Sequence, residues 1–194
     1  MLGLRCDTDP AWLATVERDV GALLRDHAHC ELKAAHSALS ILGRWGGQYP
    51  RLVGPLGALA REEIAHFEAV VARLDARGLR LEPPASDPFV VALRRAGADR
   101  DPSVPPLLDR LLVCALVEAR SAERFAMLAR GLSDGELRAF YRELLASEAR
   151  HYRLFVDLAE QCFGREAARA RLDVLAERES AIARDLGRQP TVHG

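Results

Sequence analysis

The sequence predicts an all-α protein: a four-helix bundle with a long crossover between its second and third helices and an additional C-terminal helix. Three observations carry this prediction. Apolar residues recur at 3-and-4 spacing through four long segments of the 194-residue chain, which is the period of a helix with one buried face. Glycine, proline and aspartate mark the ends of these segments. No segment alternates apolar and polar residues over the length of a strand, so no sheet is expected.

The end signals place the expected helices along the chain. They lie at about 10–42, 55–77, 88–97, 106–130, 133–163 and 165–186. The first begins at Asp9-Pro10, with an interruption near Gly21, and Gly43 is expected to end it. Gly78 is expected to close the second, and "SDGE" at 133–136 is a capping box. Short loops make the first pair and the second pair of long helices antiparallel neighbours, and the proline-rich stretch at 79–106 is the crossover.

We expect one domain over 1–194, with a core bundle at about 10–163, a solvated covering helix at about 165–186 and a frayed tail, "GRQPTVHG". The net charge of −1 excludes a protein that binds nucleic acid through overall basicity. No apolar run approaches the roughly 18 residues of a membrane span, and the N-terminus lacks the pattern of a secretory signal, so the cytoplasm is expected. The cysteines form no Cys-x-x-Cys pair, which argues against zinc ribbons, rubredoxin-type iron sites and dithiol redox centres.

Each of the four long apolar stripes contains one glutamate near its middle. These are Glu31, Glu63, Glu118 and Glu148. His66 and His151 follow the second and fourth glutamate by three residues, so each lies on the same side of its helix, one turn along. Burying one unpaired carboxylate in a dry medium costs tens of kcal/mol. Four that converge need a concentrated positive charge, which two divalent ions supply.

One glutamate from each of two helices and one Glu-x-x-His from each of the other two is the ligand set of ferritin-like dinuclear carboxylate proteins. The predicted fold is therefore a ferritin-like four-helix bundle, and no catalytic group beyond the metal ligands is expected. Carboxylate and imidazole donors suit iron or manganese, and the spacing does not distinguish the two metals. The alternative is a metal-free bundle with buried Glu–Arg or Glu–His pairs.

Several other side chains are weaker candidates. No acid occurs between Leu32 and Arg61, and this stretch is either a solvated loop or a phosphate-binding surface with aromatic groups nearby. Its candidate contacts are Lys33, Arg44 and Arg51. A second set borders the metal ligands, as partners of nearby acids or as substrate-phosphate contacts: Arg120, Arg124 and Arg150. Surface or ordinary interior positions are expected for His27, His29 and His36, and core positions for Tyr141 and Tyr152. Glu62 and Glu68 are expected to face away from the metal ligands. For Glu123, a contact with a metal ligand is the lesser option.

Four segments resemble the bacterial tRNA hydroxylase family MiaE: "CELKAAHSALSILGR", "LAREEIAHFEAVVARL", "LLVCALVEARSAERFAMLA" and "FYRELLASEARHYRLFVDLA". The resemblance covers about residues 10–165 and surrounds all six proposed ligands. It implies hydroxylation of the isopentenyl group of 2-methylthio-isopentenyl-adenosine beside the tRNA anticodon. It also implies two iron ions, O2 and two electrons from a separate donor protein. By motif, the iron ligands are Glu31, Glu63, His66, Glu118, Glu148 and His151.

Two alternatives from other classes stay open at this point. The first is a ferritin-like ferroxidase, iron-storage or peroxide-handling protein, which would use the same ligands. The second is a non-catalytic helical interaction module, which would bind no iron.

Overall fold

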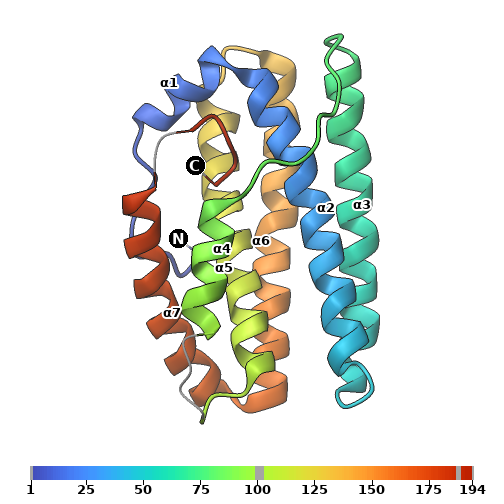
Figure 1. The fold of residues 1–194 in the computed structure, drawn as a ribbon, viewed down its shortest axis with the longest axis vertical. Helices are drawn as coiled ribbons and strands as arrows, with labels where there is room; N and C mark the ends of the chain where they lie inside the picture. Colours follow the sequence, from blue (N-terminus) through green and yellow to red (C-terminus); the bar gives the residue numbers. More distant parts are fainter. Residues whose placement is uncertain (1, 99–102, 187–188, 194) are drawn as a thin grey trace. The chain divides into compact units, whose positions relative to one another are not determined.

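The computed structural model describes residues 2–98, 103–186 and 189–193, and these residues form helices and no strand (Figure 1). In chain order the helices are α1 (Ala11–Arg18), α2 (Val20–Trp45), the 3-10 helix η1 (Pro50–Leu52), α3 (Val53–Asp75), α4 (Pro88–Ala98), α5 (Pro106–Gly131), α6 (Gly135–Phe163) and α7 (Arg165–Asp185). The all-α prediction is confirmed, and the element order is that of a ferritin-like bundle with one long crossover and an additional C-terminal helix. None of the described helices is long and apolar enough to span a membrane. Parts of the predicted crossover and tail, at 99–102, 187–188 and 194, lie outside the described residues.

Contacts along the chain define two compact units. The α2–α3 unit comprises Ala14–Ser86 and Arg188–Val192, and the α5–α6 unit comprises Met1–Leu13, Asp87–Gly187 and His193–Gly194. Each unit is built around one antiparallel helix pair. The single domain expected over 1–194 stays a prediction.

The start of α2 follows the sequence prediction, but its end does not. Asp19 separates α1 from α2, and its Oδ1 accepts a hydrogen bond from the backbone N–H of Ala22 at 2.9 Å, which caps the helix. The expected stop at Gly43 is wrong, because α2 continues to Trp45. A glycine ends a helix most effectively by taking a positive φ, and Gly43 is not among the described glycines that do so.

Other helix ends agree with the sequence more closely. Gly78 and Gly164 have φ values of 67° and 87°, and they follow α3 and α6 as predicted. The capping box at 133–136 is displaced by one residue: Asp134 is the cap, and its Oδ1 accepts hydrogen bonds from the backbone N–H groups of Glu136 and Leu137. A carboxylate at this position also interacts favourably with the positive end of the helix dipole.

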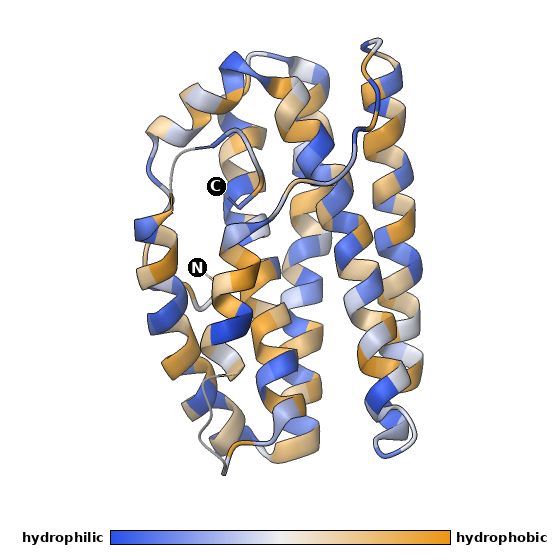
Figure 2. Ribbon diagram, in the orientation of Figure 1, coloured by the Kyte–Doolittle hydropathy of each residue, from blue (hydrophilic) through white to orange (hydrophobic). Residues whose placement is uncertain are grey.

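In the α2–α3 unit the two helices lie side by side, and each turns one face inward (Figure 1). The buried residues recur at 3-and-4 spacing and include Leu24, Ala28, Glu31, Ala35 and Ala38 of α2, and Leu56, Leu59, Glu63, Val70 and Leu74 of α3. Figure 2 shows the corresponding alternation of hydrophobic and hydrophilic bands along both helices. The glutamates predicted on the apolar stripes therefore lie on the buried faces.

In the α5–α6 unit, α4 and α7 both pack against α5. Gly97 permits the close approach of α4, because a Cβ at this position would lie 2.7 Å from Cγ2 of Val113. Helix α7 buries Leu172 and Leu175 and exposes most of its charged side chains. The additional C-terminal helix predicted from the sequence is confirmed.

The expectation of a frayed tail is wrong for His193. This side chain is 3% exposed and stacks on the ring of Phe89, with centroids 5.2 Å apart. Its Nδ1 lies 3.0 Å from Oδ2 of Asp87, and its Nε2 lies 3.2 Å from Oγ of Ser121. The three groups have the order of a serine–histidine–carboxylate relay, but Ser121 lies in the middle of α5, where its N–H belongs to the helix and forms no oxyanion hole. The cluster therefore anchors the tail.

Replacing His193 by alanine should lower the free energy of unfolding by about 2–3 kcal/mol, because it removes a ring stack and two hydrogen bonds of a buried side chain. Urea unfolding followed by circular dichroism measures the change. His36, exposed on α2, provides the control, since its replacement should change the stability by less than about 0.5 kcal/mol. Equal effects of the two substitutions would contradict an anchoring role for His193.

Candidate metal centre

The α2–α3 unit brings together two carboxylates and one imidazole. Glu31 comes from α2, and Glu63 and His66 come from α3. Nδ1 of His66 lies 3.1 Å from Oε2 of Glu63 and 3.9 Å from Oε2 of Glu31. Glu63 is fully buried and Glu31 is 4% exposed. The three predicted ligands of this unit therefore form one cluster, which we call the α2–α3 half-site.

The α5–α6 unit brings together the same three groups. Nδ1 of His151 lies 3.9 Å from Oε2 of Glu118 and 4.0 Å from Oε1 of Glu148. Glu118 is 5% exposed, and Glu148 and His151 are each 2% exposed. These residues form the α5–α6 half-site. In both half-sites the histidine lies one turn after the glutamate of the same helix. Its Nδ1 atom points toward the two carboxylates of the half-site.

The donor set of each half-site fits a divalent cation. Two buried carboxylates within about 4 Å of one imidazole repel each other strongly in a medium of low polarity. A neutral histidine has one lone pair to offer and cannot balance their charge. One divalent ion per half-site balances two carboxylates, and oxygen and imidazole donors are those that iron and manganese accept.

The α2–α3 half-site has two outer partners that the sequence interpretation missed. His27, expected at a surface or ordinary interior position, is fully buried, and its Nε2 lies 2.6 Å from Oε1 of Glu31. Glu62, expected to face away, places Oε1 3.9 Å from Nε2 of His66. The i,i+4 spacing of both pairs was a signal that could have found them.

Arg120, a candidate substrate contact, lies instead inside the α5–α6 unit and is fully buried. Its Nε and Nη2 donate to the two carboxylate oxygens of Glu179 at 2.8 and 3.1 Å, and its Nη1 donates to Glu123 at 3.0 Å. Burial lowers the pKa of the Arg120 guanidinium, but the carboxylates of Glu179 and Glu123 outweigh this, and the net pKa is raised. This geometry favours the first of the two sequence interpretations, a partner of nearby acids.

Arg124 and Glu123 belong to the same network. Arg124 is 5% exposed, its guanidinium lies 4.8 Å from the ring centroid of Trp12, and its Nε donates to Oγ1 of Thr8. Glu123 accepts hydrogen bonds from the backbone N–H and the hydroxyl of Thr8 at 2.8 and 2.6 Å. Together these contacts hold the N-terminal segment against α5.

The other basic candidates differ in how they present their charge. Arg150 is exposed and donates to Oγ of Ser147 at 3.0 Å. Nζ of Lys33 is buried and makes no hydrogen bond, so this residue does not present its charge at a surface. Arg44 and Arg51 are exposed, and the Arg44 guanidinium lies 4.9 Å from the ring centroid of Trp45.

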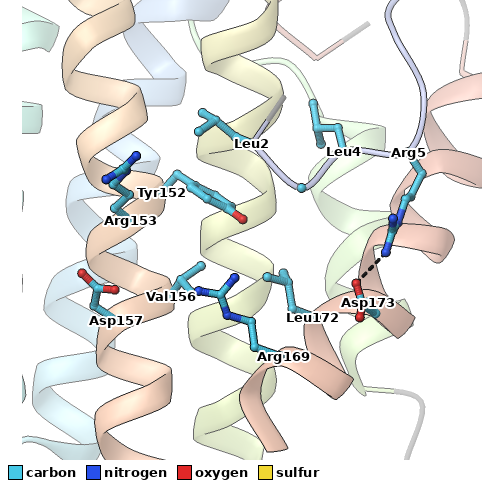
Figure 3. Close-up of a pocket in the computed structure, with 11 residues that line it drawn as sticks. Leu2, Leu4, Arg5, Tyr152, Arg153, Val156, Asp157, Arg169, Leu172 and Asp173 are labelled. Atoms are coloured by element: carbon cyan, nitrogen blue, oxygen red, sulfur yellow. Dashed lines mark hydrogen bonds and ion pairs between the residues drawn. The ribbon is translucent and has the colours of Figure 1, made fainter. Parts of the chain in front are cut away.

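The two tyrosines have different surroundings. Tyr141 is fully buried against Phe125 and Phe140, as expected for a core aromatic residue. Tyr152 lines a pocket of about 660 Å³ between α6, α7 and the N-terminal segment (Figure 3). Burial raises the pKa of its phenol, with the nearby Arg169 and Arg153 opposing the shift. Tyr152 is thus a pocket residue and not an interior one.

Comparison with known proteins gives consistent similarities. The family model described as "tRNA-(MS[2]IO[6]A)-hydroxylase (MiaE)" matches residues 2–194. The tRNA 2-(methylsulfanyl)-N(6)-isopentenyladenosine(37) hydroxylase of Pseudomonas putida is 42% identical over 168 residues, which are 87% of this chain and 80% of the relative. The hydroxylase of the same name from Salmonella typhimurium is 29% identical over 209 residues, with 81% and 75% covered. Among solved structures, "Protein 43 with aldehyde deformylating oxygenase activity from Synechococcus" has a TM-score of 0.91 and 40% identity, covering 98% of this chain and 95% of that one.

Proposed function

Because the chain belongs to the MiaE family of tRNA hydroxylases, we propose that it hydroxylates the isopentenyl group of 2-methylthio-isopentenyl-adenosine in tRNA, next to the anticodon. The observation that carries this proposal is the family match over residues 2–194. The two buried half-sites support it, since hydroxylation of a C–H bond by O2 needs a redox cofactor, and protein side chains alone do not supply that chemistry. The relatives do not support the alternative of an iron-storage or peroxide-handling protein.

The proposed cofactor is a pair of iron ions held by Glu31, Glu63, His66, Glu118, Glu148 and His151. When bound, reduced iron supplies the activation of O2 that hydroxylation requires. The chain's own residues hold the ligands in place and exclude water from them, and each half-site contributes two negative charges that offset one divalent ion. Nδ1 of each histidine is the donor atom that faces the carboxylates in its half-site.

The remaining reactants follow from the balance of the reaction. Hydroxylation of R–H by O2 yields R–OH and water, and consumes two electrons and two protons. A separate electron-donor protein is the proposed source of the electrons, and the cytoplasm, where tRNA is modified, is the proposed location.

The proposed tRNA-binding surface is the end of the α2–α3 pair, within the acid-free stretch from Leu32 to Arg61. Arg44 and Arg51 are exposed there, beside the aromatic side chains of Trp45 and Tyr49. Arginine offers phosphate a bidentate partner, and unstacked RNA bases stack on aromatic rings. Arg150 of α6 is a second candidate contact.

Charge reversal of Arg44 and Arg51 to glutamate should weaken tRNA binding by about 10-fold or more and leave the iron content unchanged. Binding weakens because each phosphate contact that is lost also removes the favourable free energy of counterion release. A filter-binding titration at two salt concentrations measures both the affinity and its salt slope. The matched control reverses Arg94 and Arg95, exposed on α4. An equal loss in the control would indicate a general charge effect, and unchanged binding in the first variant would exclude this surface.

The solved relative from Synechococcus favours a second candidate function. Its title attributes aldehyde deformylating oxygenase activity to that protein, and its identity to this chain, 40%, is close to that of the P. putida hydroxylase. An aldehyde-deformylating oxygenase would use the same half-sites with an aldehyde as the substrate.

One experiment tests both functions. The protein is loaded with ferrous iron and given a reductant, O2 and either tRNA carrying the modified adenosine or an aldehyde. Mass spectrometry of the digested tRNA should show a nucleoside heavier by one oxygen atom, and 18O2 should label it. Full iron occupancy without a tRNA product would refute the proposal, and a deformylated product would support the second function.

A further inference from the structure

The two half-sites have the same ligands but different surroundings, and the difference begins at His27. Nε2 of His27 lies 2.6 Å from Oε1 of Glu31, and the two side chains are 0% and 4% exposed. A Glu31 that binds a cation is ionised and can only accept hydrogen bonds. Nε2 of His27 therefore carries the proton, and this N–H donates a hydrogen bond to Oε1 of Glu31.

This hydrogen bond leaves one defined oxygen of Glu31 for a metal ion. Oε2 lies 3.9 Å from Nδ1 of His66, the atom that also faces Glu63. Oε1 is directed toward His27, and Oε2 is directed toward the other ligands. A carboxylate held in this way loses less conformational freedom on binding, which increases its affinity for the ion.

The second outer partner supports the histidine of the same half-site. Nδ1 of His66 faces Glu63, whereas Nε2 lies 3.9 Å from Oε1 of Glu62. A carboxylate on the far nitrogen favours a proton at Nε2, and this leaves the lone pair of Nδ1 for a metal. Glu62 is partly exposed, at 38% of its side chain, so its carboxylate lies at the edge of the half-site.

The α5–α6 half-site has different residues at the two equivalent positions. Four residues before Glu118 is Cys114, whose thiol is a weak hydrogen-bond donor. Directly before Glu148 is Ser147, whose Oγ accepts a hydrogen bond from Arg150 at 3.0 Å. An imidazole and a carboxylate thus support the ligands in the α2–α3 half-site, and a thiol and a hydroxyl occupy their places in the α5–α6 half-site.

We infer that His27 is a positioning residue for Glu31 and that the α2–α3 half-site binds its metal ion first and more tightly. This inference rests on the proposed function only in assuming that both half-sites bind a cation. It makes the two metal positions unequal, with the order of filling set by His27 and supported by Glu62.

Anaerobic calorimetric titration of the metal-free protein with Fe2+ tests the inference. The wild type should bind two ions in two steps of unequal affinity. His27→Leu should weaken the tighter step by about 10–100-fold and leave the other step unchanged. His27→Gln should retain most of the affinity, because its amide nitrogen can still donate to Oε1. Cys114→Ala, the matched substitution in the other unit, should leave the tighter step unchanged.

Mössbauer spectra with one equivalent of 57Fe provide a second readout that a purely structural role of His27 would not move. The wild type should show one ferrous doublet, and His27→Leu should show two. Equal losses in His27→Leu and His27→Gln, or a tighter step weakened equally by Cys114→Ala, would overturn the inference. If His27→Leu does not fold, Glu62→Gln tests whether the α2–α3 half-site provides the tighter step, and Ser147→Ala is the matched control in the other unit. Only Glu62→Gln should weaken the tighter step.

The outcome for the wild type separates this inference from the proposed function. A wild type that binds fewer than two ions contradicts the dinuclear cofactor itself. A wild type that binds two ions with equal affinity contradicts only the unequal half-sites.

Discussion

Replacing Glu63 or Glu148 with glutamine should reduce the rate of hydroxylation by about 1000-fold or more. The proposed redox metal lowers the reaction barrier by several kcal/mol, and a neutral amide does not balance the charge of the metal ion as a carboxylate does. Each variant should lose at least one of the two ions, which metal analysis by mass spectrometry measures. Glu68→Gln, an exposed neighbour on α3, is the control and should keep full activity and metal content.

The stability of the metal-free variants distinguishes a ligand from a structural residue. If Glu63 is a metal ligand, removing its buried charge should leave the metal-free protein as stable as the wild type or more stable by about 0.5–2 kcal/mol, as at other sites that exchange stability for function. If it is one half of a buried structural ion pair, the same change should cost about 3–5 kcal/mol. Urea unfolding in the presence of a chelator measures the sign of the change in the free energy of unfolding. A loss of stability with metal binding unchanged would refute its assignment as a ligand.

The parts of the site that could be predicted from the sequence are those with a periodic signal. Glu31 and Glu63 are recognisable because a charged residue on an apolar stripe needs a compensating partner, and the i,i+3 spacing from Glu63 to His66 specifies their shared side. The same reasoning applies in the second unit. Local helix geometry therefore predicts which side chains lie on each buried face, and the pairing of α2 with α3 and of α5 with α6 brings the proposed ligands of each unit together.

The parts that could not be predicted depend on contacts between residues distant in the chain. Arg120 finds its partner in Glu179 of α7, and no spacing rule relates the two positions. His193 is buried by its contacts with Asp87 and Phe89, although its sequence context is that of a disordered end. Gly43 is expected to end α2, but the helix continues to Trp45 and is capped by Gly46; the sequence does not state which of several nearby glycines takes this role.

Arg120→Leu should lower the free energy of unfolding by about 3–5 kcal/mol, since it leaves buried carboxylates without their counterion. For a chain of this size that corresponds to a decrease in Tm of roughly 6–20 °C. Glu179→Leu should cost less, because Arg120 would keep its hydrogen bonds to Glu123 and to the backbone carbonyl of Cys6. Urea unfolding of both variants measures the difference, and Arg94→Leu on the surface of α4 is the control.

The double variant Arg120→Leu/Glu179→Leu should recover much of the loss, because a buried ion pair replaced by apolar side chains is often neutral in stability. A double variant less stable than Arg120→Leu alone would show that Glu123 or Thr8, and not Glu179, is the main partner of the guanidinium. Iron content should remain unchanged in all three folded variants, since the network contains none of the proposed ligands.

The pH dependence of the stability of Arg120→Leu tests whether Glu179 is the group that Arg120 neutralises. Burial already raises the pKa of the Glu179 carboxyl in the wild type, with Arg120 opposing the shift, so removing the guanidinium should raise it further. A carboxyl whose pKa is higher in the folded state than in the unfolded state binds more protons when folded. It therefore favours folding below its unfolded pKa, about 4.3, and loses that contribution as the pH rises through its folded pKa. Relative to the wild type, Arg120→Leu should become more stable as the pH falls from 8 to 5. A stability difference that does not change over this range would mean that Glu179 is not the group left uncompensated.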